Sequence, residues 1–209
     1  MTTIEDAPEV TAGPQRRRGA ALEDAIRRAA FEELSAVGYT AFSVEGVAAR
    51  ARTGKASIYR RWPTKQELVW DALSAVLPAA AEGGGLPRQY DDSVTTVEAL
   101  YEVAHVIAAV ITSPAGDVIR AIKCEAMSDP DLARLVDERF QAPRRAAMVA
   151  LLRRGVERGE VRAGADSVLV ADVLPAVLMH RVLMQRERLG EAEIREIMEQ
   201  IVIPLVEVR

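Results

Sequence analysis

The stretch FSVEGVAARARTGKASIYRRWPTKQELV, residues 42–69, decides the fold of the N-terminal part of the chain. It predicts a short helix over 43–50, which begins at Ser43, a residue type whose hydroxyl caps helix N-termini. The segment Arg52-Thr53-Gly54 predicts a tight turn, and a second short helix follows over 55–60. Two short helices joined by a turn of three or four residues form a helix-turn-helix, a motif that places its second helix in the major groove of DNA.

The second short helix has side chains suited to DNA on its surface and apolar anchors behind it. Groups that reach base edges or phosphates occur at Lys55, Ser57, Tyr59 and Arg60. We expect Ile58 and Trp62 to pack into the core. For Tyr59 two interpretations stay open, a phosphate contact with a half-buried ring or packing of the ring in the core. Small residues at the expected crossing of the two helices, Ala48, Ala49 and Ala56, predict a close approach of their backbones.

Charge is distributed unevenly along the chain. The net charge is −4, but residues 14–66 contain eleven Lys or Arg against five acids, whereas residues 67–209 have a net charge of −7. Phosphate neutralisation depends on the local patch, so a basic N-terminal part on an acidic body is compatible with a nucleic-acid partner. A solvated helix surface with chance charge fluctuation is the alternative interpretation.

Helical periodicity covers the remaining sequence, and strand patterning is nearly absent. Apolar residues repeat at three-and-four spacing over 22–37 and again over 194–205. Start signals occur at Thr64-x-x-Glu67, Ser113-Pro114 and Asp129-Pro130, and glycines that typically end helices follow periodic runs at Gly38, Gly159 and Gly190. We predict an all-α protein of about nine helices, with a disordered tail over 1–15, a three-helix helix-turn-helix domain over 16–66 and a larger helical domain over 67–209. The glycine-rich segment 83–90 (GGGLPRQY) is the strongest linker.

The run over residues 42–69 resembles the DNA-binding domain of the TetR family of bacterial transcriptional regulators. The resemblance covers roughly residues 20–73, and the turn, the Ile-Tyr pair, the aromatic-Pro pair and the Lys-x-x-Leu spacing all fall in register. One departure is Thr53-Gly54, where members often have a Val-Ser pair, so the turn hydroxyl would come from Thr53. The resemblance implies a homodimer that binds a palindromic operator, most often as a repressor that a small-molecule effector releases from DNA. The large helical region over 93–184, with its methionines and scattered polar residues, predicts that this effector is mostly apolar. An activator, or an interaction protein on the same scaffold without ligand-controlled release, is the alternative.

The resemblance also implies roles for individual positions in DNA binding. Ser43 matches a phosphate contact at a helix N-terminus, Tyr59 a phosphate-bonding tyrosine and Lys65 a lysine at the DNA backbone. The positions at or beside the major groove are Thr53, Gly54, Lys55, Ala56, Ser57 and Arg60, of which Arg60 varies among members. The run Arg16-Arg17-Arg18 is either a solvated stretch or a basic arm that reaches the minor groove or phosphates.

The C-terminal helices are expected to dimerise and to hold the effector, as they do in the family. We expect the last two helices, over about 166–208, to form a four-helix bundle with those of a second copy. Helices around 93–112, 115–127, 140–158 and 168–184 are candidates for the pocket. Its candidate lining residues are Tyr101, His105, Arg120, Cys124, Met127, Phe140, Met148, Met179 and His180.

Each of these candidate lining residues has a plainer interpretation. His105 on an apolar face is commonly a hydrogen-bonded core histidine, His180 is equally suited to the dimer contact, and methionines commonly fill cores. The apolar run over 168–184 approaches a membrane-spanning length, but Asp172 and Arg181 within it oppose membrane insertion. We interpret it as a helix buried on two sides.

Other function classes find little support in the sequence. With two histidines, one cysteine and no nucleophile or phosphate-loop motif, we expect neither an enzyme, a metal site nor a cofactor. The single cysteine, Cys124, excludes an intramolecular disulfide. An acidic start over 1–10 is unlike a secretory signal, and the expected location is the cytoplasm without membrane attachment.

Overall fold

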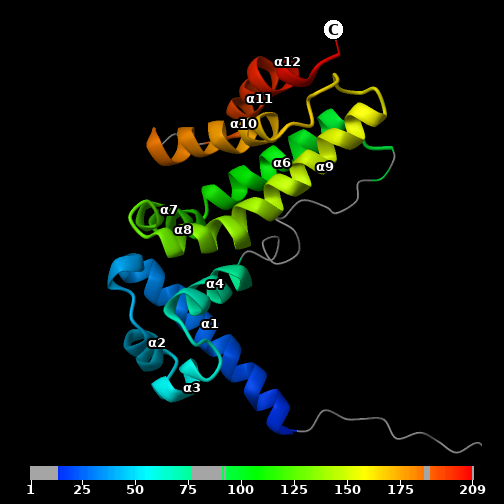
Figure 1. Ribbon diagram of the computed structural model, residues 1–209. Coiled ribbons are helices and arrows are strands. Elements are labelled where there is room, and N and C mark those ends of the chain that lie inside the picture. Colours follow the sequence, from blue (N-terminus) through cyan, green and yellow to red (C-terminus); the bar gives the residue numbers. More distant parts are fainter. Residues whose placement is uncertain (1–13, 77–90, 92, 186–188, 209) are drawn as a thin grey trace, which may run out of the picture.

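The computed structural model describes residues 14–76, 91, 93–185 and 189–208. All regular elements in these parts of the chain are helical, and they form nine continuous runs, which confirms the all-α prediction. Figure 1 shows α1–α4 at one end of the molecule and α6–α12 at the other. The predicted linker over 83–90 lies outside the described residues.

The helices follow one another in a simple order (Figure 1). The first group is α1 (Pro14–Ala41), α2 (Val44–Arg50), α3 (Lys55–Tyr59) and α4 (Lys65–Val76). The second begins with α6 (Thr96–Ile111), α7 (Pro114–Ala126) and α8 (Pro130–Val136), and α8 continues through the π-helical segment η1 (Asp137–Gln141) into α9 (Ala142–Glu157). The last two runs are α10 (Val168–Met179) with η2 (His180–Met184), and α11 (Glu191–Ile197) with η3 (Met198–Val202) and α12 (Ile203–Val206).

Most predicted helix boundaries occur where local chemistry requires them. Ser113 and Asp129 accept backbone N–H groups at the starts of α7 and α8, each ahead of a proline. Thr64 and Glu67 exchange hydrogen bonds as a capping box at α4. At the end of α9, Gly159 has φ 70°, the left-handed conformation that favours glycine.

Two local predictions were wrong, and a third was confirmed. Gly190 does not end a helix: it has φ −97° and precedes α11 as its N-cap. Residues 14 and 15, predicted to belong to a disordered tail, form the start of α1, while residues 1–13 lie outside the described residues. Gly38, with φ 73°, does end the long helical run, and a short turn of helix follows it.

The described helices bury two hydrophobic cores. The first joins α1–α4 to α7 and α8, around fully buried Ile26, Ile58 and Leu68. The second lies among α6 and α9–α12, around Leu152 and Leu178. Because α7 and α8 contribute to the first core, the first group of helices, α1–α4, packs directly against these two helices of the second group. The predicted domain boundary after residue 66 falls inside α4, and the division into domains stays a prediction.

None of the described helices is, by itself, both long and apolar enough to cross a membrane. Only α6 and α7 taken together pass that test by length and composition, and they are bent by 81° at their junction.

Candidate DNA-binding surface and effector cavity

The first helix of the motif is held at both ends. At its start, Ser43 Oγ accepts a hydrogen bond from the Gly46 N–H at 3.0 Å, as the predicted cap requires. At its end, the Thr53 N–H donates to the Ala48 carbonyl and the Arg52 N–H to the Ala49 carbonyl, the paired bonds of a Schellman motif. Glycine usually takes the left-handed position of this motif, but here it is Arg52, with φ 50°.

The helix α3 presents most of its surface to solvent. Lys55, Ala56 and Arg60 are exposed, and the Tyr59 side chain is 47% exposed. Ile58 is fully buried and Trp62 nearly so, which confirms that they anchor the helix from behind. Tyr59 is therefore outside the core, and its ring is half-exposed as the phosphate interpretation requires.

Two residues of α3 engage partners within the protein. The Lys55 ammonium pairs with the Glu45 carboxylate at 2.7 Å on the exposed surface. Arg61 donates to the Ser57 hydroxyl and backbone carbonyl, and its guanidinium also pairs with Glu23 of α1 at 2.9 Å. The Lys55 ammonium has three N–H donors and an exposed side chain, so it can engage a DNA phosphate or base edge beside Glu45 or in its place.

Lys65, at the start of α4, lies in an aromatic cage. Its Nζ donates to the Tyr39 carbonyl oxygen at 2.6 Å and lies 4.2 Å from the centroid of the Tyr39 ring and 5.7 Å from that of Phe42. Burial lowers the pKa of Lys65 below its ordinary value. Lys65 therefore ties α4 to the end of α1, a structural role that sequence reasoning did not predict.

The crossing of α1 and α2 depends on Gly46. A Cβ at this position would collide with the carboxylate of Glu33, which is 8% exposed and pairs with Arg50 at 2.6 Å.

Of the small residues predicted to sit at the crossing of α2 and α3, Ala48 is buried, but Ala49 and Ala56 are exposed, so the prediction was wrong for those two.

The helix α4 connects α1–α3 and their turns, which form the predicted DNA-binding side and are called the DNA-side helices, to α6–α12, which are called the body. Its Asp71 carboxylate accepts from Trp62 Nε1 at 2.9 Å and pairs with Arg27 of α1 at 2.7 Å. Next to it, Trp70 meets Phe140 of η1 edge to face, with the ring centroids 6.0 Å apart. Two adjacent residues of α4 thus contact different parts of the protein: Asp71 contacts Trp62 and α1, and Trp70 contacts η1.

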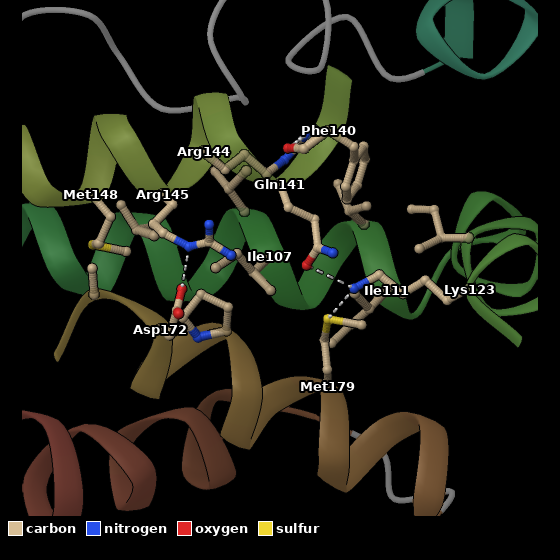
Figure 2. Close-up of a pocket in the computed structure, with 16 residues that line it drawn as sticks. Ile107, Ile111, Lys123, Phe140, Gln141, Arg144, Arg145, Met148, Asp172 and Met179 are labelled. Carbon is tan, nitrogen blue, oxygen red and sulfur yellow. Dashed lines mark hydrogen bonds and ion pairs between the residues drawn. The ribbon is translucent and has the colours of Figure 1, made fainter. Parts of the chain in front are cut away.

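The other side of Phe140 lines a cavity of about 130 Å³ in the body. Figure 2 shows that its wall comes from α6, α7, the η1–α9 run and α10, the four regions predicted to form the pocket. Most of the wall is aliphatic, with Ile107, Ile111 and Met148 among its residues. A cavity of this order admits a molecule with a single ring or a short chain.

Comparison with known proteins identifies the family. The model described as bacterial regulatory proteins of the tetR family matches residues 26–71, and the model of the tetracyclin repressor-like C-terminal domain matches residues 90–201. The chain belongs to the TetR family. Members of this family are transcriptional regulators and not enzymes, in agreement with the analysis of the sequence.

Individual relatives agree in extent and fold. The chain is 31% identical to the DNA-binding transcriptional repressor TetR of Mycobacteroides abscessus, over 90% of this chain and 96% of that protein. It is 28% identical to the HTH-type transcriptional regulator YdeS of Bacillus subtilis, over 87% and 88% of the two chains. Its structure is similar to that of Salmonella enterica GusR, with a TM-score of 0.72, 19% identity and coverage of 89% and 95%.

In this TetR-family chain, the residues predicted to line the pocket divide into two groups. Met148, Met179 and Phe140 line the cavity. Cys124, Met127 and His180 are exposed outside it, and Met127 is 88% exposed. Helical spacing alone does not distinguish the side of a helix that faces a cavity from the side that faces solvent.

The remaining candidates also lie outside the cavity. Arg120 pairs with Asp117 on the exposed side of α7, and Tyr101 packs against the second core. The His105 imidazole contacts the Tyr101 carbonyl and the Glu191 carboxylate, both at 2.7 Å, so it bridges α6 and α11. The hydrogen bond with Glu191 raises the pKa of His105. We correct the expected lining accordingly, and ligand binding itself stays a prediction.

Sequence reasoning missed several polar residues at the two candidate sites. Lys123, Gln141, Arg144, Arg145 and Asp172 line the cavity but were not predicted there. On the DNA side, exposed Arg52 was missed, although a charged residue between Ala51 and Thr53 in a predicted turn was a usable signal. Arg16, Arg17 and Arg18 fall within α1, and their side chains lie outside what the structure describes.

The predicted dimer region of this TetR-family chain carries exposed apolar side chains. On α10 and its continuation, Val168, Leu169 and Met184 are exposed, with Leu169 at 78%. The outer surface of the last helical run is instead largely polar, because Glu196 of α11 and Glu199 and Gln200 of η3 are exposed. Within the described residues, no cluster of three or more His, Cys, Asp or Glu could hold a metal ion.

Proposed function

We propose that this protein is a repressor that binds a palindromic DNA operator as a homodimer in the cytoplasm. The observation that carries the proposal is the exposed surface of α3, where Lys55, Ala56, Tyr59 and Arg60 surround a buried Ile58. A helix anchored from behind and polar in front is the geometry that a major groove accepts. Arg52, exposed in the preceding turn, adds a further cation on the same motif.

The proposed dimer uses residues 166–208. Leu169, Ala176 and His180 occupy exposed positions of the α10 run at spacings of seven and four, so they lie along one side of the helix. The exposed apolar side chains of this run are Val168, Leu169 and Met184, and covering them with a second copy removes apolar surface from water. Two-fold symmetry then presents two α3 helices to successive major grooves, about 34–36 Å apart.

The proposed control is release from the operator by a small, mostly apolar effector in the cavity. Phe140 forms part of the cavity wall and also contacts Trp70, so a ligand that moves Phe140 changes the packing of α4. The neighbouring Asp71 holds Trp62 and Arg27 of the DNA-side helices. A hundredfold loss of operator affinity requires about 2.7 kcal/mol of differential binding, and by linkage the operator weakens the effector by the same factor.

The test of DNA binding uses the DNA upstream of the protein's own gene, by footprinting and by titration at several salt concentrations. We expect Lys55→Ala and Tyr59→Phe each to weaken operator binding about tenfold. In a plot of log affinity against log salt concentration, Lys55→Ala should also make the slope shallower by about one, the amount expected for one lost phosphate contact. Arg134→Ala is the matched control, because Arg134 is an exposed arginine of α8 that pairs with Asp131.

Both variants should remain folded dimers, since Lys55 and Tyr59 are exposed and lie outside the core. A footprint that is absent for the wild-type protein, or variants that bind as tightly as the control, would contradict the proposal. Unfolding of Tyr59→Phe would instead show that the tyrosine hydroxyl is structural.

A further inference from the structure

The cavity in the body contains two cations without a carboxylate partner. Among the described residues, Lys123 Nζ has two long contacts, to Gln141 Oε1 at 3.5 Å and to Met179 Sδ at 3.6 Å. Figure 2 shows Lys123 between these two groups. Arg144 donates to the Phe140 carbonyl at 2.7 Å, and its Cζ lies 3.5 Å from the centroid of the Phe140 ring. No carboxylate of the described residues pairs with either group.

The other charged groups of the lining neutralise one another. Arg145 Nε donates to Asp172 Oδ1 at 3.1 Å, which is visible in Figure 2. With three cations and one carboxylate, the lining has a net charge of +2. Residues 67–209, in which the cavity lies, have a net charge of −7, so the cavity is cationic inside an acidic body.

Both unpaired cations are partly removed from water. Burial lowers the pKa of Arg144 to about 10, and burial together with the nearby Arg144 charge lowers the pKa of Lys123. A partly buried charge without a counter-ion is costly, and repulsion between two like charges that line one cavity raises that cost. An anion between them would remove much of it, whereas a neutral ligand would not.

We propose that the cavity binds an apolar molecule that carries one carboxylate, with the carboxylate between Lys123 and Arg144 and the apolar part against the aliphatic wall. This inference rests on the proposed function, because it specifies the chemical class of the effector. The volume of about 130 Å³ limits the apolar part to roughly one ring or a short chain.

The test compares acids with neutral molecules of the same shape, by calorimetry on the full-length protein without DNA. The pairs are benzoate with benzyl alcohol, cyclohexanecarboxylate with cyclohexylmethanol, and octanoate with 1-octanol. We expect at least one acid to bind ten times more tightly than its alcohol, and acetate and phosphate to bind far more weakly than that acid.

Variants then locate the carboxylate. Lys123→Met and Arg144→Met should each reduce the acid-to-alcohol ratio to near one, while binding of the alcohol stays equal or improves. Arg120→Met is the matched control on α7, because Arg120 is exposed and paired with Asp117. The ligand-free melting temperature of Lys123→Met should equal or exceed that of the wild type, since an unpaired charge has been removed.

The inference is overturned if no acid binds at millimolar concentration, if acids and alcohols bind equally, or if the acid-to-alcohol ratio survives in both variants. Equal binding of phosphate or acetate would show a bare anion site and also overturn it. Release of the operator is measured separately. An acid that binds without releasing the operator contradicts effector control and leaves this inference intact. Release of the operator by neutral compounds alone supports effector control and contradicts this inference.

Discussion

Gly46 is the residue on which the position of α2 against α1 depends. The Glu33 carboxylate occupies the space that a side chain at Gly46 would need, and Arg50 neutralises that carboxylate at 2.6 Å. A glycine therefore leaves room at the helix crossing for the nearly buried Glu33 carboxylate of a partly exposed ion pair. Since α2 positions the turn ahead of α3, this contact also orients α3, the helix proposed to enter the major groove.

Gly46→Ala should lower the free energy of unfolding by at most about 1 kcal/mol, because the added methyl group forces the Glu33 carboxylate away from its pair with Arg50, while the higher helix propensity of alanine offsets part of that cost. Denaturant unfolding of the purified protein measures the change. Gly19→Ala is the matched control: Gly19 is helical with no heavy atom near its Cβ position, so alanine there should raise stability by up to about 1 kcal/mol. Equal effects of the two substitutions would disprove the steric explanation.

Helices far apart in the chain are joined by polar contacts. The pair formed by His105 of α6 and Glu191 of α11, at 2.7 Å, links the helix that lines the cavity to the last helical run. Because the carboxylate raises the pKa of His105, the folded protein holds this proton more tightly than the unfolded chain does. The stabilisation is fully present below pH 6.5, the ordinary pKa, and is lost as the pH rises through the raised pKa.

We therefore expect an NMR titration to give His105 a pKa above 6.5, and Glu191→Gln to return that pKa toward the ordinary value. Across the same pH range, the stability of the wild type should fall slightly more than that of Glu191→Gln, since both side chains are largely exposed. Glu196→Gln on the same helix is the control and should leave the titration unchanged. A pKa of His105 at or below 6.5 would contradict the hydrogen bond.

The contact between η1 and α4 is the proposed path of control. Phe140→Leu should preserve operator binding but weaken effector binding, because Phe140 lines the cavity. It should also reduce the coupling between the two at least fivefold, because the edge-to-face contact with Trp70 is lost. Operator affinity with and without a saturating effector measures this coupling. Ile107→Val is the control, since Ile107 lines the cavity away from α4 and should alter effector affinity alone. Undiminished coupling in Phe140→Leu would exclude this path.

For the whole molecule, dimerisation decides whether two α3 helices act together. Leu169→Glu should convert the dimer to a monomer at micromolar concentration and weaken operator binding at least a hundredfold, because it places a charge in the proposed apolar contact. Light scattering after gel filtration measures the mass. Met127→Glu, at an even more exposed methionine outside residues 166–208, should leave the dimer intact. If Leu169→Glu remains a dimer, the interface does not include Leu169, and the proposed contact is wrong.

Local sequence patterns were sufficient for much of the proposed DNA-binding surface. Ser43 caps α2, the turn follows Ala51, and Ile58 and Trp62 are buried as predicted. These features depend on residues within a few positions of one another. The aromatic cage of Lys65 was not predictable in this way, because its partner Tyr39 lies 26 positions away.

The cavity was only partly predictable for the same reason. Its four helical regions were expected, since periodicity identifies helices, but only Met148, Met179 and Phe140 of the expected residues line it. The rotation of each helix about its axis determines which side faces the cavity, and that rotation is set by packing against the other helices. Lys123 and Arg144 are ordinary surface-type residues in the sequence and become cavity residues only through this packing.

The sequence by itself determined the all-helical class, the helix-turn-helix with its caps and turn, and the basic N-terminal part on an acidic body. These properties follow from short-range spacing and from composition, which do not depend on how the helices pack. Only the tertiary structure decided which cations are neutralised and which are left in the cavity. Arg27 finds Asp71 44 positions away and His105 finds Glu191 86 positions away, whereas Lys123 and Arg144 find no carboxylate among the described residues.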